Sequence, residues 1–293
     1  MHRKQKRGQI ILHIFFILLI IMYIYPLLMV ISVSFSDERA ITQNGYQLIP
    51  EQFTTAAYEL VFKNPDTMLR AYGVTIFFTV VATLLSTMVI ALLAYPLSRS
   101  NFLWKGPLSF YVFFTMLFSG GMVPSYLLNT TVLHLNDTIW IYIIPSLVSA
   151  YNVMIVRTNY KSLPNEMIEA AKLDGANELT ICFRIMIPLC KAALSSVAFL
   201  FLVNKWNDWM TSELYIRDIN LYSLQYLLQR LLRNAEYLKN SMSQGVTFYA
   251  DKLMPTESLR FAMAICAAGP VLCIFPFFQK FFSKGMTLGG VKG

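Results

Sequence analysis

The sequence predicts an all-α membrane protein that crosses the bilayer several times, and three observations lead to this fold class. First, 56% of the residues are hydrophobic and only 14% are charged, whereas a soluble domain of this length needs more charge on its surface. Second, several apolar runs exceed the roughly 18 residues that mark a spanning helix. Third, Lys and Arg fall largely at the flanks of these runs, as the positive-inside rule expects. We predict a polytopic domain of six transmembrane helices over 10–282.

The first apolar run, about 10–35, follows a basic tail at 1–9. Its charge resembles that of a signal peptide, but the run is too long and lacks a small-residue cleavage site. We therefore keep it as the first span. The next segment, 36–70, is polar and acidic, which suits the outer side of the membrane.

The second span is predicted at about 71–97 and the third at about 108–128, with a short basic loop between them. The positive-inside rule places this loop in the cytoplasm. Because Gly120, Gly121 and Pro124 interrupt the third span, we expect its outer half to be irregular. Irregular backbone at membrane depth is tolerated only where it faces protein or water.

The remaining spans are predicted at about 138–156, 191–210 and 258–282. Basic residues after the fourth span place the loop at 162–189 in the cytoplasm. Six spans put both termini inside. The long outer segment, 211–257, contains leucines at helical spacing, which predict an amphipathic surface helix.

The loop at 162–189 is a polar interruption that we interpret as a docking module. Pro164 suits a first turn, where its missing N–H is unpaired anyway, and Glu166 suits the positive end of a helix dipole. Gly175 can adopt the left-handed conformation that closes a helix, and a second helix can run over about 177–187. The residues available for one apolar face of the first helix are Met167, Ala170, Ala171 and Leu173.

The same loop resembles the EAA loop of ABC importer permeases in its Glu-Ala-Ala-x-x-Asp-Gly-Ala form. Ile187 stands where the family usually has leucine. In that family the first helix of the loop sits in a groove of a cytoplasmic ATPase subunit, and the glycine is the turn. The alternative is an ordinary amphipathic loop helix with a chance Glu-Ala-Ala sequence. The glycine, isoleucine and proline that follow at the family's spacing argue against this alternative. The residues to which the resemblance assigns ATPase coupling are Glu169, Ala170, Ala171, Asp174, Gly175, Ala176 and Pro188.

The C-terminal tail, 283–293, is similar to the Gly-Leu-Thr-x-Gly-x-Val-Lys-Gly ending of one permease in carbohydrate ABC importers, the group that includes the maltose system. Met286 replaces the usual leucine. The alternative is a loose glycine-rich terminus. In the family this tail reaches the interface of the two ATPase subunits, which implies such a role for Thr287, Gly289, Gly290, Val291 and Lys292.

Enzyme chemistry lacks a recognisable site in the sequence. No G-x-x-x-x-G-K-[ST] sequence is present, so we expect ATP and Mg to be bound by partner ATPase subunits and not by this chain. The three histidines are too scattered for an H-E-x-x-H zinc site, and no G-x-S-x-G motif occurs. The four cysteines include no Cys-x-x-Cys pair, so we interpret them as packing residues. We expect neither catalysis nor nucleic-acid binding.

Polar and aromatic residues near the end of the fifth span are candidates for a solute pathway, because polar groups in spans are costly and often mark one. The alternative is an interfacial belt, with both tryptophans at headgroup level, Lys205 snorkelling and Lys205 pairing with Asp208. The carbohydrate family often has Trp-Asn-Glu-Phe here, which residues 206–209 resemble. The candidates are Asn204, Lys205, Trp206, Asn207, Asp208 and Trp209, with Tyr126 and Asn152 as weaker ones.

The resemblance implies a permease subunit in the bacterial cytoplasmic (inner) membrane. Its implied partners are a second homologous permease, an ATPase dimer and an extracytoplasmic solute-binding protein that meets the outer segment 211–257. The overall sequence resembles the branch associated with complex polysaccharide fragments, so the expected solute is an oligosaccharide. Lys205, Arg230 and Arg233 would suit an acidic one, such as an alginate or pectin fragment. The alternatives are an importer of another polar solute, or a six-span channel or secondary transporter.

Overall fold

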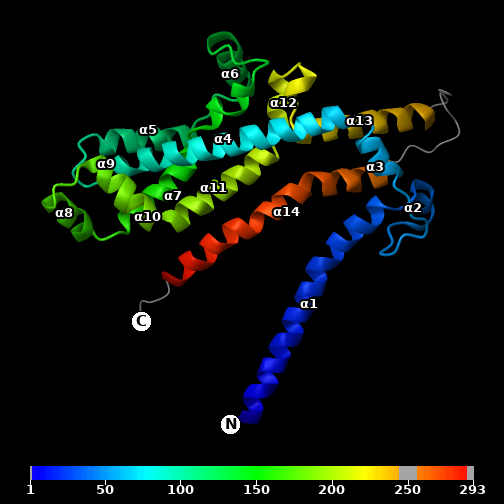
Figure 1. Cartoon of the computed structure of the whole chain (residues 1–293), viewed down its shortest axis with the longest axis horizontal. Coiled ribbons are helices and arrows are strands. Elements are labelled where there is room, and N and C mark those ends of the chain that lie inside the picture. The colour runs from blue at the N-terminus through cyan, green and yellow to red at the C-terminus, as the bar shows by residue number, and fades with distance from the viewer. Residues whose placement is uncertain (1, 244–255, 289–293) are drawn as a thin grey trace. The chain divides into compact units, whose positions relative to one another are not determined.

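The structure, a computed structural model, describes residues 2–243 and 256–288, whose regular elements are helices joined by loops (Figure 1). Between these helices the described residues contain one isolated β-bridge, Ser36 with Phe53. The predicted all-α class is therefore confirmed. The α-helices are α1 (His2–Ser34), α2 (Glu38–Asn44), α3 (Ala56–Val61), α4 (Pro65–Ser98), α5 (Lys105–Leu117), α6 (Met122–Leu127), α7 (Ala150–Lys161), α8 (Asn165–Leu173), α9 (Glu178–Ile181), α10 (Ile187–Leu189), α11 (Lys191–Trp206), α12 (Met210–Tyr215), α13 (Leu224–Ser243) and α14 (Glu257–Leu288). The π-turns are η1 (Leu128–Val132) and η4 (Cys182–Met186), and the 3-10 turns are η2 (Ile139–Tyr142), η3 (Ile144–Ser146) and η5 (Ile219–Leu221).

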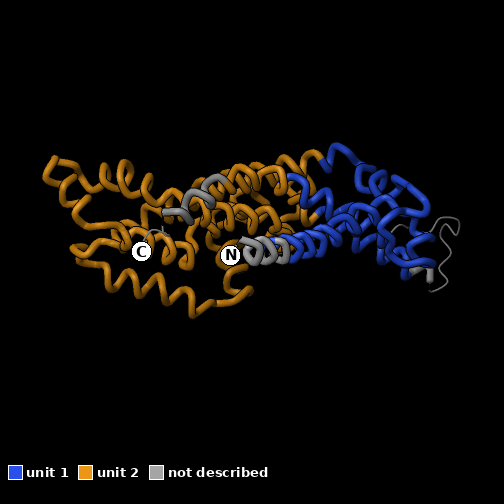
Figure 2. Tube along the Cα trace, turned by 90° about the horizontal axis from the view of Figure 1, so that it is seen from below, with its two compact units in different colours: residues 1–68, 227–270 blue, residues 69–226, 271–293 orange. Residues whose placement is uncertain are grey.

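The chain divides into two compact units (Figure 2). Unit 1 contains residues 1–68 and 227–270, and unit 2 contains residues 69–226 and 271–293. Both regions that the sequence singles out for function, the loop at 162–189 and the segment at 204–209, lie in unit 2.

Three helical segments among the described residues are long and apolar enough to cross a membrane, namely Leu12–Ser34, Pro65–Ser98 and Glu257–Gln279. Three bent helix pairs also pass when each pair counts as one span, which gives up to six spans by length and composition. The six-span count stays a prediction. The pairs are Lys105–Leu117 with Met122–Val132 (113°), Ile139–Ser146 with Ala150–Lys161 (46°), and Glu178–Leu189 with Lys191–Trp206 (78°).

The irregular stretch predicted around Gly120 and Gly121 is confirmed. Helix α5 ends at Leu117, and α6 restarts at Met122 after a bend of 113°. Gly121 has φ +86°, a conformation that an L-residue with a side chain adopts only at a cost. The bend therefore depends on glycine at this position.

The segment at 138–156, expected to be one span, is not one helix. It consists of the 3-10 turns η2 and η3 followed by the first part of α7. Pro145 lies in η3 and cannot donate a backbone hydrogen bond, which disfavours a continuous α-helix there. Helix α7 begins anew at Ala150, where the Ser149 hydroxyl accepts the N–H of Asn152 at 3.4 Å. The fifth span also ends earlier than expected, since α11 stops at Trp206.

Helix α4 begins at Pro65, within the segment that the sequence analysis assigned to an outer polar loop. Proline is favoured in a first helical turn, and Asp66 follows at the positive end of the helix dipole. The sequence therefore contains the signals for a helix start at Pro65. They were not recognised because the first turns of α4 are polar and the predicted span begins at the apolar residues. The predicted helix in the outer segment is confirmed as α13, whose Leu224, Leu227 and Leu228 are buried.

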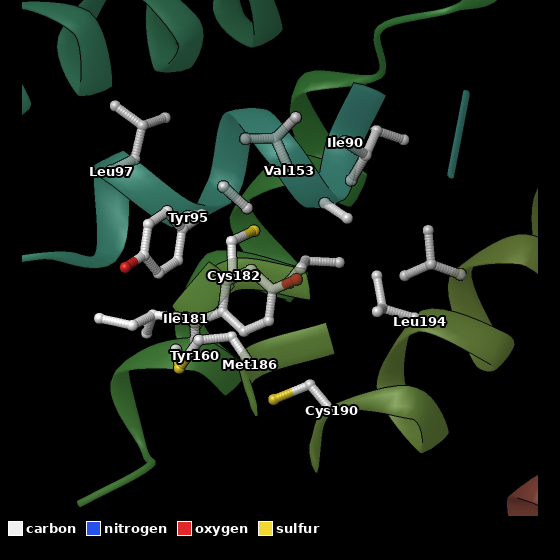
Figure 3. Packing of buried hydrophobic residues seen from close by; sticks show 14 of the residues in the cluster. Ile90, Tyr95, Leu97, Val153, Tyr160, Ile181, Cys182, Met186, Cys190 and Leu194 are labelled. Carbon is white, nitrogen blue, oxygen red and sulfur yellow. The ribbon is translucent and has the colours of Figure 1, made fainter. Parts of the chain in front are cut away.

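The principal hydrophobic cluster of unit 2 joins the end of α4 to α7, the α8–α9 region and α11 (Figure 3). Ile90 and Leu97 come from α4, and Tyr160 comes from α7. Cys182 and Cys190 are buried thiols within this cluster, which confirms the packing interpretation for these two cysteines. The cluster fixes the α8–α9 region against the spans.

A second cluster in unit 2 lies nearer the start of α4. The rings of Phe78 and Tyr142 are stacked there with centroids 4.3 Å apart. The Tyr142 hydroxyl donates to the carbonyl of Leu221 at 2.9 Å and lies 2.5 Å from the Ser212 hydroxyl. This cluster therefore ties α4 to the segment that follows α12.

In unit 1, the buried acidic residue Glu38 of α2 contacts the beginning of α14. The carboxylate of Glu38 accepts the backbone N–H groups of Glu257 at 3.1 Å and Ser258 at 3.2 Å. The Thr256 hydroxyl donates to the same carboxylate at 2.8 Å, and Lys239 Nζ lies 3.5 Å from it. Glu38 thus caps the free N–H groups of α14 from a helix far away in sequence.

Candidate functional site

The loop after α7 has the helix, turn and second helix that its sequence predicts. Helix α8 ends at Leu173, and Gly175 has φ +80°. The N–H of Ala176 donates to the carbonyl of Ala171 at 2.9 Å, across the glycine turn. This bond satisfies one of the carbonyls that a helix end leaves free. The predicted left-handed glycine is therefore confirmed.

Helix α8 is held mainly by one buried side chain, with the half-buried Ala171 packed beside it. Ile168 is 2% exposed and belongs to the principal hydrophobic cluster, whereas Met167 and Leu173 are 42% and 90% exposed. Glu169 and Ala170 are also exposed. The helix is thus held along a narrow face and presents the Glu-Ala side outward. The predicted apolar face does not include Ile168, which lies three residues before Ala171 and shares its side of the helix.

The second half of the loop starts with a capped helix. Asn177 Oδ1 accepts the N–H of Thr180 at 2.7 Å, which fixes the beginning of α9. The Glu178 carboxylate accepts a hydrogen bond from the Tyr95 hydroxyl of α4 and lies 2.5 Å from Lys172 Nζ. These contacts connect both arms of the turn to the end of α4. Pro188 lies exposed in α10, directly before the bend into α11.

The predicted C-terminal site is described only in part. Thr287 lies in the last turn of α14. Gly289, Gly290, Val291 and Lys292 lie outside the described residues.

A cavity of about 790 Å³ in unit 2 is lined by one face of α11 together with residues of α6 and α12. Figure 1 shows α6 and α12 at one end of unit 2 and α8 at the other. Four of the predicted pathway residues line this cavity: Asn204, Asn207, Asp208 and Trp209. The remaining lining residues are Met122, Ser125, Phe199, Leu200, Val203, Met210, Thr211, Leu214 and Tyr215.

Lys205 and Trp206 do not line this cavity. They are 8% and 2% exposed, so both side chains are buried in the protein. The ion pair that the belt interpretation predicted is present, with Lys205 Nζ 3.1 Å from Asp208 Oδ2. The charge of Lys205 is therefore balanced by a carboxylate inside the protein.

Asp208 organises the turn between α11 and α12. Besides Lys205, its carboxylate accepts the Thr211 hydroxyl at 2.8 Å and the Thr211 N–H at 3.1 Å. Its backbone carbonyl accepts the Ser223 hydroxyl at 2.9 Å. Asp208 thus serves more as a structural cap for the cavity wall than as a free carboxylate.

Tyr126 and Asn152, the weaker candidates, lie outside the lining of the cavity. Asn152 is 8% exposed in the first turn of α7. Tyr126 stacks on Tyr215, with ring centroids 5.4 Å apart and an interplanar angle of 21°. Tyr215 lines the cavity, and its hydroxyl accepts a hydrogen bond from Asn129 Nδ2 at 3.2 Å. An aromatic pair therefore lies at one wall, joined by contacts that sequence spacing does not reveal.

Asp137 fixes the segment that follows α12. Its carboxylate accepts the N–H groups of Asp218 at 2.9 Å and Arg217 at 3.0 Å, and these bonds hold the pKa of Asp137 below its ordinary value. Its own N–H donates to the Tyr215 carbonyl at 2.9 Å. Asp137 has φ +56°, which Asp tolerates better than most residues. The cavity aromatic Tyr215 is thus held from its backbone as well as from its hydroxyl.

Within residues 2–243 and 256–288, no three His, Cys, Asp or Glu side chains gather in a way that could hold a metal ion. The lining of the cavity beside α11 contains amide, hydroxyl and aromatic groups. Such a lining can hydrogen-bond hydroxyls and cover the apolar faces of a ring-shaped solute, but it shows no nucleophile with an adjacent base.

No protein-family model matches the chain. Among curated proteins, it is 33% identical to the polygalacturonan/rhamnogalacturonan transport system permease protein YtcP of Bacillus subtilis (strain 168), over 99% of this chain and 100% of the relative. It is 37% identical to protein LplC of the same organism, over 92% of this chain and 90% of the relative. A crystal structure of a bacterial ABC transporter involved in the import of the acidic polysaccharide alginate is 27% identical in sequence, with a TM-score of 0.75, and covers 96% of this chain and 98% of the chain compared.

Proposed function

We propose a function for this chain from one premise: the chain belongs to the family of carbohydrate ABC transport system permeases. It is a multi-pass inner membrane protein and the permease component of an importer for sugars or oligosaccharides. Membership of this family disfavours the channel and the secondary transporter. The function proposed beyond this premise concerns the path of the solute, the kind of solute and the coupling to ATP.

The proposed solute path passes through the cavity beside α11. The observation that carries this proposal is that Asn204 and Asn207, one helical turn apart, lie on the cavity face with Trp209, while Lys205 and Trp206 are buried away from it. Amide groups can bond sugar hydroxyls, and an aromatic ring can cover the apolar face of a sugar. A volume of about 790 Å³ lies within the ordinary range for small-molecule sites.

The proposed solute is an acidic oligosaccharide, such as an alginate or pectin fragment. Support comes from the names of two similar proteins, one that transports polygalacturonan or rhamnogalacturonan and one involved in alginate import. The cavity lining itself contains the carboxylate of Asp208 and no cationic side chain. Recognition of the acid groups would therefore rest on cations elsewhere, among which Arg230 and Arg233 on α13 are exposed.

The proposed coupling element is α8 with its glycine turn. Glu169 and Ala170 are exposed on a helix whose opposite side is anchored by Ile168, which leaves that face accessible to an ATPase subunit. Asp174, Gly175 and Ala176 form the turn that transmits a displacement of α8 to α9 and, through α10 with Pro188, to α11. The C-terminal tail would lie at the interface of the two ATPase subunits.

The proposed assembly contains this chain, a second homologous permease, two ATPase subunits and an extracytoplasmic solute-binding protein that meets the segment 211–257. ATP and Mg would be bound by the ATPase subunits. Their closure would move α8, and the spans would switch between inward-facing and outward-facing states. Both termini would lie on the cytoplasmic side.

The proposal is tested in two steps. The tagged chain is first purified in a mild detergent from its native cell, and the proteins bound at stoichiometric level are identified by mass spectrometry. A second permease and an ATPase are expected, and recovery of the chain alone as a stable, monodisperse protein would contradict the assembly.

The complex is then reconstituted with its binding protein, and ATPase stimulation is measured with acidic and with neutral oligosaccharides of equal length. Stronger stimulation by the acidic series is expected. Equal stimulation by the two series would refute the acidic solute while leaving the permease function intact.

A further inference from the structure

A second cavity, of about 560 Å³, lies in unit 2 where α4 ends. Its walls come from three places: the last turns of α4, the α4–α5 connection and the α8–α9 turn. Leu92, Pro96, Phe102 and Leu179 supply apolar surface, and Arg99 and Lys172 supply positive charge. This second cavity shares no residue with the cavity beside α11 through which the solute is proposed to pass, called the solute cavity below.

The charged groups of this second cavity do not balance. Glu178 is the acidic residue of the lining, and its carboxylate is already bound by Lys172 Nζ at 2.5 Å and by the Tyr95 hydroxyl. In the part of the chain that the structure describes, no acidic side chain lies within ion-pair distance of Arg99. With Arg99 and Lys172 against the single carboxylate of Glu178, the lining carries a net positive charge beside an apolar wall.

The position of the second cavity relates it to a membrane surface. Arg99 directly follows Ser98, the last residue of an apolar helix long enough to cross a bilayer. The connection to α5 exposes Leu103 and Trp104, by 88% and 62% of their surfaces. Tryptophan is enriched at headgroup level, where its ring meets lipid and its N–H meets water. The cationic rim of the cavity thus lies at the end of a span and next to an interfacial anchor.

We propose that the second cavity binds an anionic phospholipid from the adjacent leaflet, with the lipid phosphate on Arg99 and the start of an acyl chain against Leu92, Pro96 and Phe102. A cationic pocket between helices at a membrane surface is suited to an anionic headgroup. Guanidinium is the side chain best matched to a phosphate, because it donates two parallel hydrogen bonds. A free phosphate would use the cation but not the apolar wall.

The lipid would contact both the end of α4 and the α8–α9 turn, because both contribute walls of the cavity. It would thereby brace the loop against the spans in addition to the buried anchor at Ile168. This consequence rests on the coupling function proposed above for α8, whereas the binding of the lipid does not.

The experiment measures lipid retention by the full chain, purified in a mild detergent with whatever subunits stay bound. After delipidation, phosphatidylglycerol or phosphatidylcholine is added at equal concentration, and the bound lipid is read as added mass in native mass spectrometry. The protein is expected to retain phosphatidylglycerol in preference to phosphatidylcholine. The variant R99Q should lose about fivefold in apparent affinity for phosphatidylglycerol, the effect of one cation near a membrane surface.

The matched control is R184Q, which removes the same charge from an exposed position in η4 outside the second cavity. This control should retain the lipid as the parent protein does. A second variant, F102N, removes part of the apolar wall and keeps both cations, so it should weaken retention of the two-chain lipid. If R99Q does not fold, F102N still tests the proposal. Glycerol phosphate, which has the headgroup without chains, should not displace the lipid at equal concentration.

Three results would overturn the proposal: equal retention of the two lipids, equal loss in R99Q and R184Q, or full displacement by glycerol phosphate. The first would show binding without preference for an anionic headgroup, the second would show general attraction to the basic side of the protein, and the third would show a simple anion site. Because the readout is bound lipid mass, none of these results depends on whether α8 couples to an ATPase.

Discussion

The carboxylate of Glu38 accepts the backbone N–H of Ser258 at 3.2 Å, and so a residue of α2 caps α14 from 220 positions away in the sequence. The same carboxylate accepts the N–H of Glu257 and the hydroxyl of Thr256, and Glu38 is only 4% exposed. Burial of a carboxylate is costly unless hydrogen bonds compensate it, and here several do. Unit 1 is therefore held together at this point by a polar contact rather than by apolar packing alone.

Replacement of Glu38 by Gln should destabilise unit 1 by about 1–3 kcal/mol, since buried N–H groups of α14 lose a charged acceptor. The measurement is the thermal unfolding midpoint of the purified protein. The control E51Q alters an exposed carboxylate that accepts side-chain hydrogen bonds from Asn44 and Gln47, and it should shift stability by less than about 0.5 kcal/mol. Similar effects of the two changes would refute the role of the cap.

The stability of unit 1 should also depend on pH through Glu38. Burial raises the pKa of this carboxyl, but hydrogen bonds from Thr256, Glu257 and Ser258 outweigh burial and leave the pKa below its ordinary value. The unfolded chain then binds the proton more readily, so the contribution is complete above the unfolded pKa of about 4.3 and is lost as the pH falls through the folded pKa. Unfolding midpoints measured from pH 7 to pH 3 should fall less steeply in E38Q than in the parent protein.

The turn at Gly175 should tolerate side chains according to their backbone preference. A Cβ added at Gly175 would meet no atom within 4 Å, so Gly175→Ala should cost only the left-handed backbone, about 1–2 kcal/mol. Gly175→Asn should cost less. Gly175→Pro cannot adopt φ +80° and loses the N–H that donates to the Lys172 carbonyl at 3.0 Å. Solute uptake should therefore persist in the Asn variant and disappear in the Pro variant. Normal uptake by a correctly inserted Pro variant would contradict the proposed coupling.

Substitutions at the buried and at the exposed face of α8 should have different effects on its stability. Ile168→Ala removes a buried side chain and should destabilise the loop by about 2–5 kcal/mol, whereas Met167→Ala alters an exposed one and should change stability little. Hydrogen exchange of the α8 amides measures the difference directly. If both variants exchanged equally fast, α8 would not be held through Ile168.

Alanine substitutions of the two tryptophans near the end of α11 should affect different properties, one the stability of the protein and the other its response to solute. Trp206 is 2% exposed, so Trp206→Ala should destabilise the protein by about 3–5 kcal/mol. Trp209 lines the solute cavity, so Trp209→Ala should leave the unfolding midpoint nearly unchanged and weaken stimulation of ATP hydrolysis by the solute. A Trp209→Ala protein that is fully stimulated would exclude this ring from the solute path.

The sequence supports correct predictions where one local rule acts. A left-handed glycine is the common way to end a helix, which is why Gly175 could be assigned, and Lys205 and Asp208 are opposite charges only three residues apart. The irregular third span followed from Gly120 and Gly121 in the same way. Each of these features depends on a few neighbouring residues.

Long-range contacts and helix phase could not be predicted. Trp206 and Trp209 have similar chemistry and were assigned alike, but α11 ends at Trp206, so Trp209 lies beyond the helix and faces the cavity. The stacking of Tyr126 on Tyr215 joins segments that no local pattern relates. The cap by Glu38 is likewise a tertiary contact. These features depend on how distant elements come together.

The π-turn η4, Cys182–Met186, gives the path from loop to span an unusual register. A π-turn is equivalent to one residue inserted into an α-helix, and each residue of an α-helix rotates the chain by about 100°. The azimuth at which Glu178 reaches α4 is therefore offset from the azimuth at which α10 presents Ile187 to the principal hydrophobic cluster. Deletion of one residue within η4 would remove the offset and rotate one of these two contacts out of place, while leaving both sets of side chains in the chain.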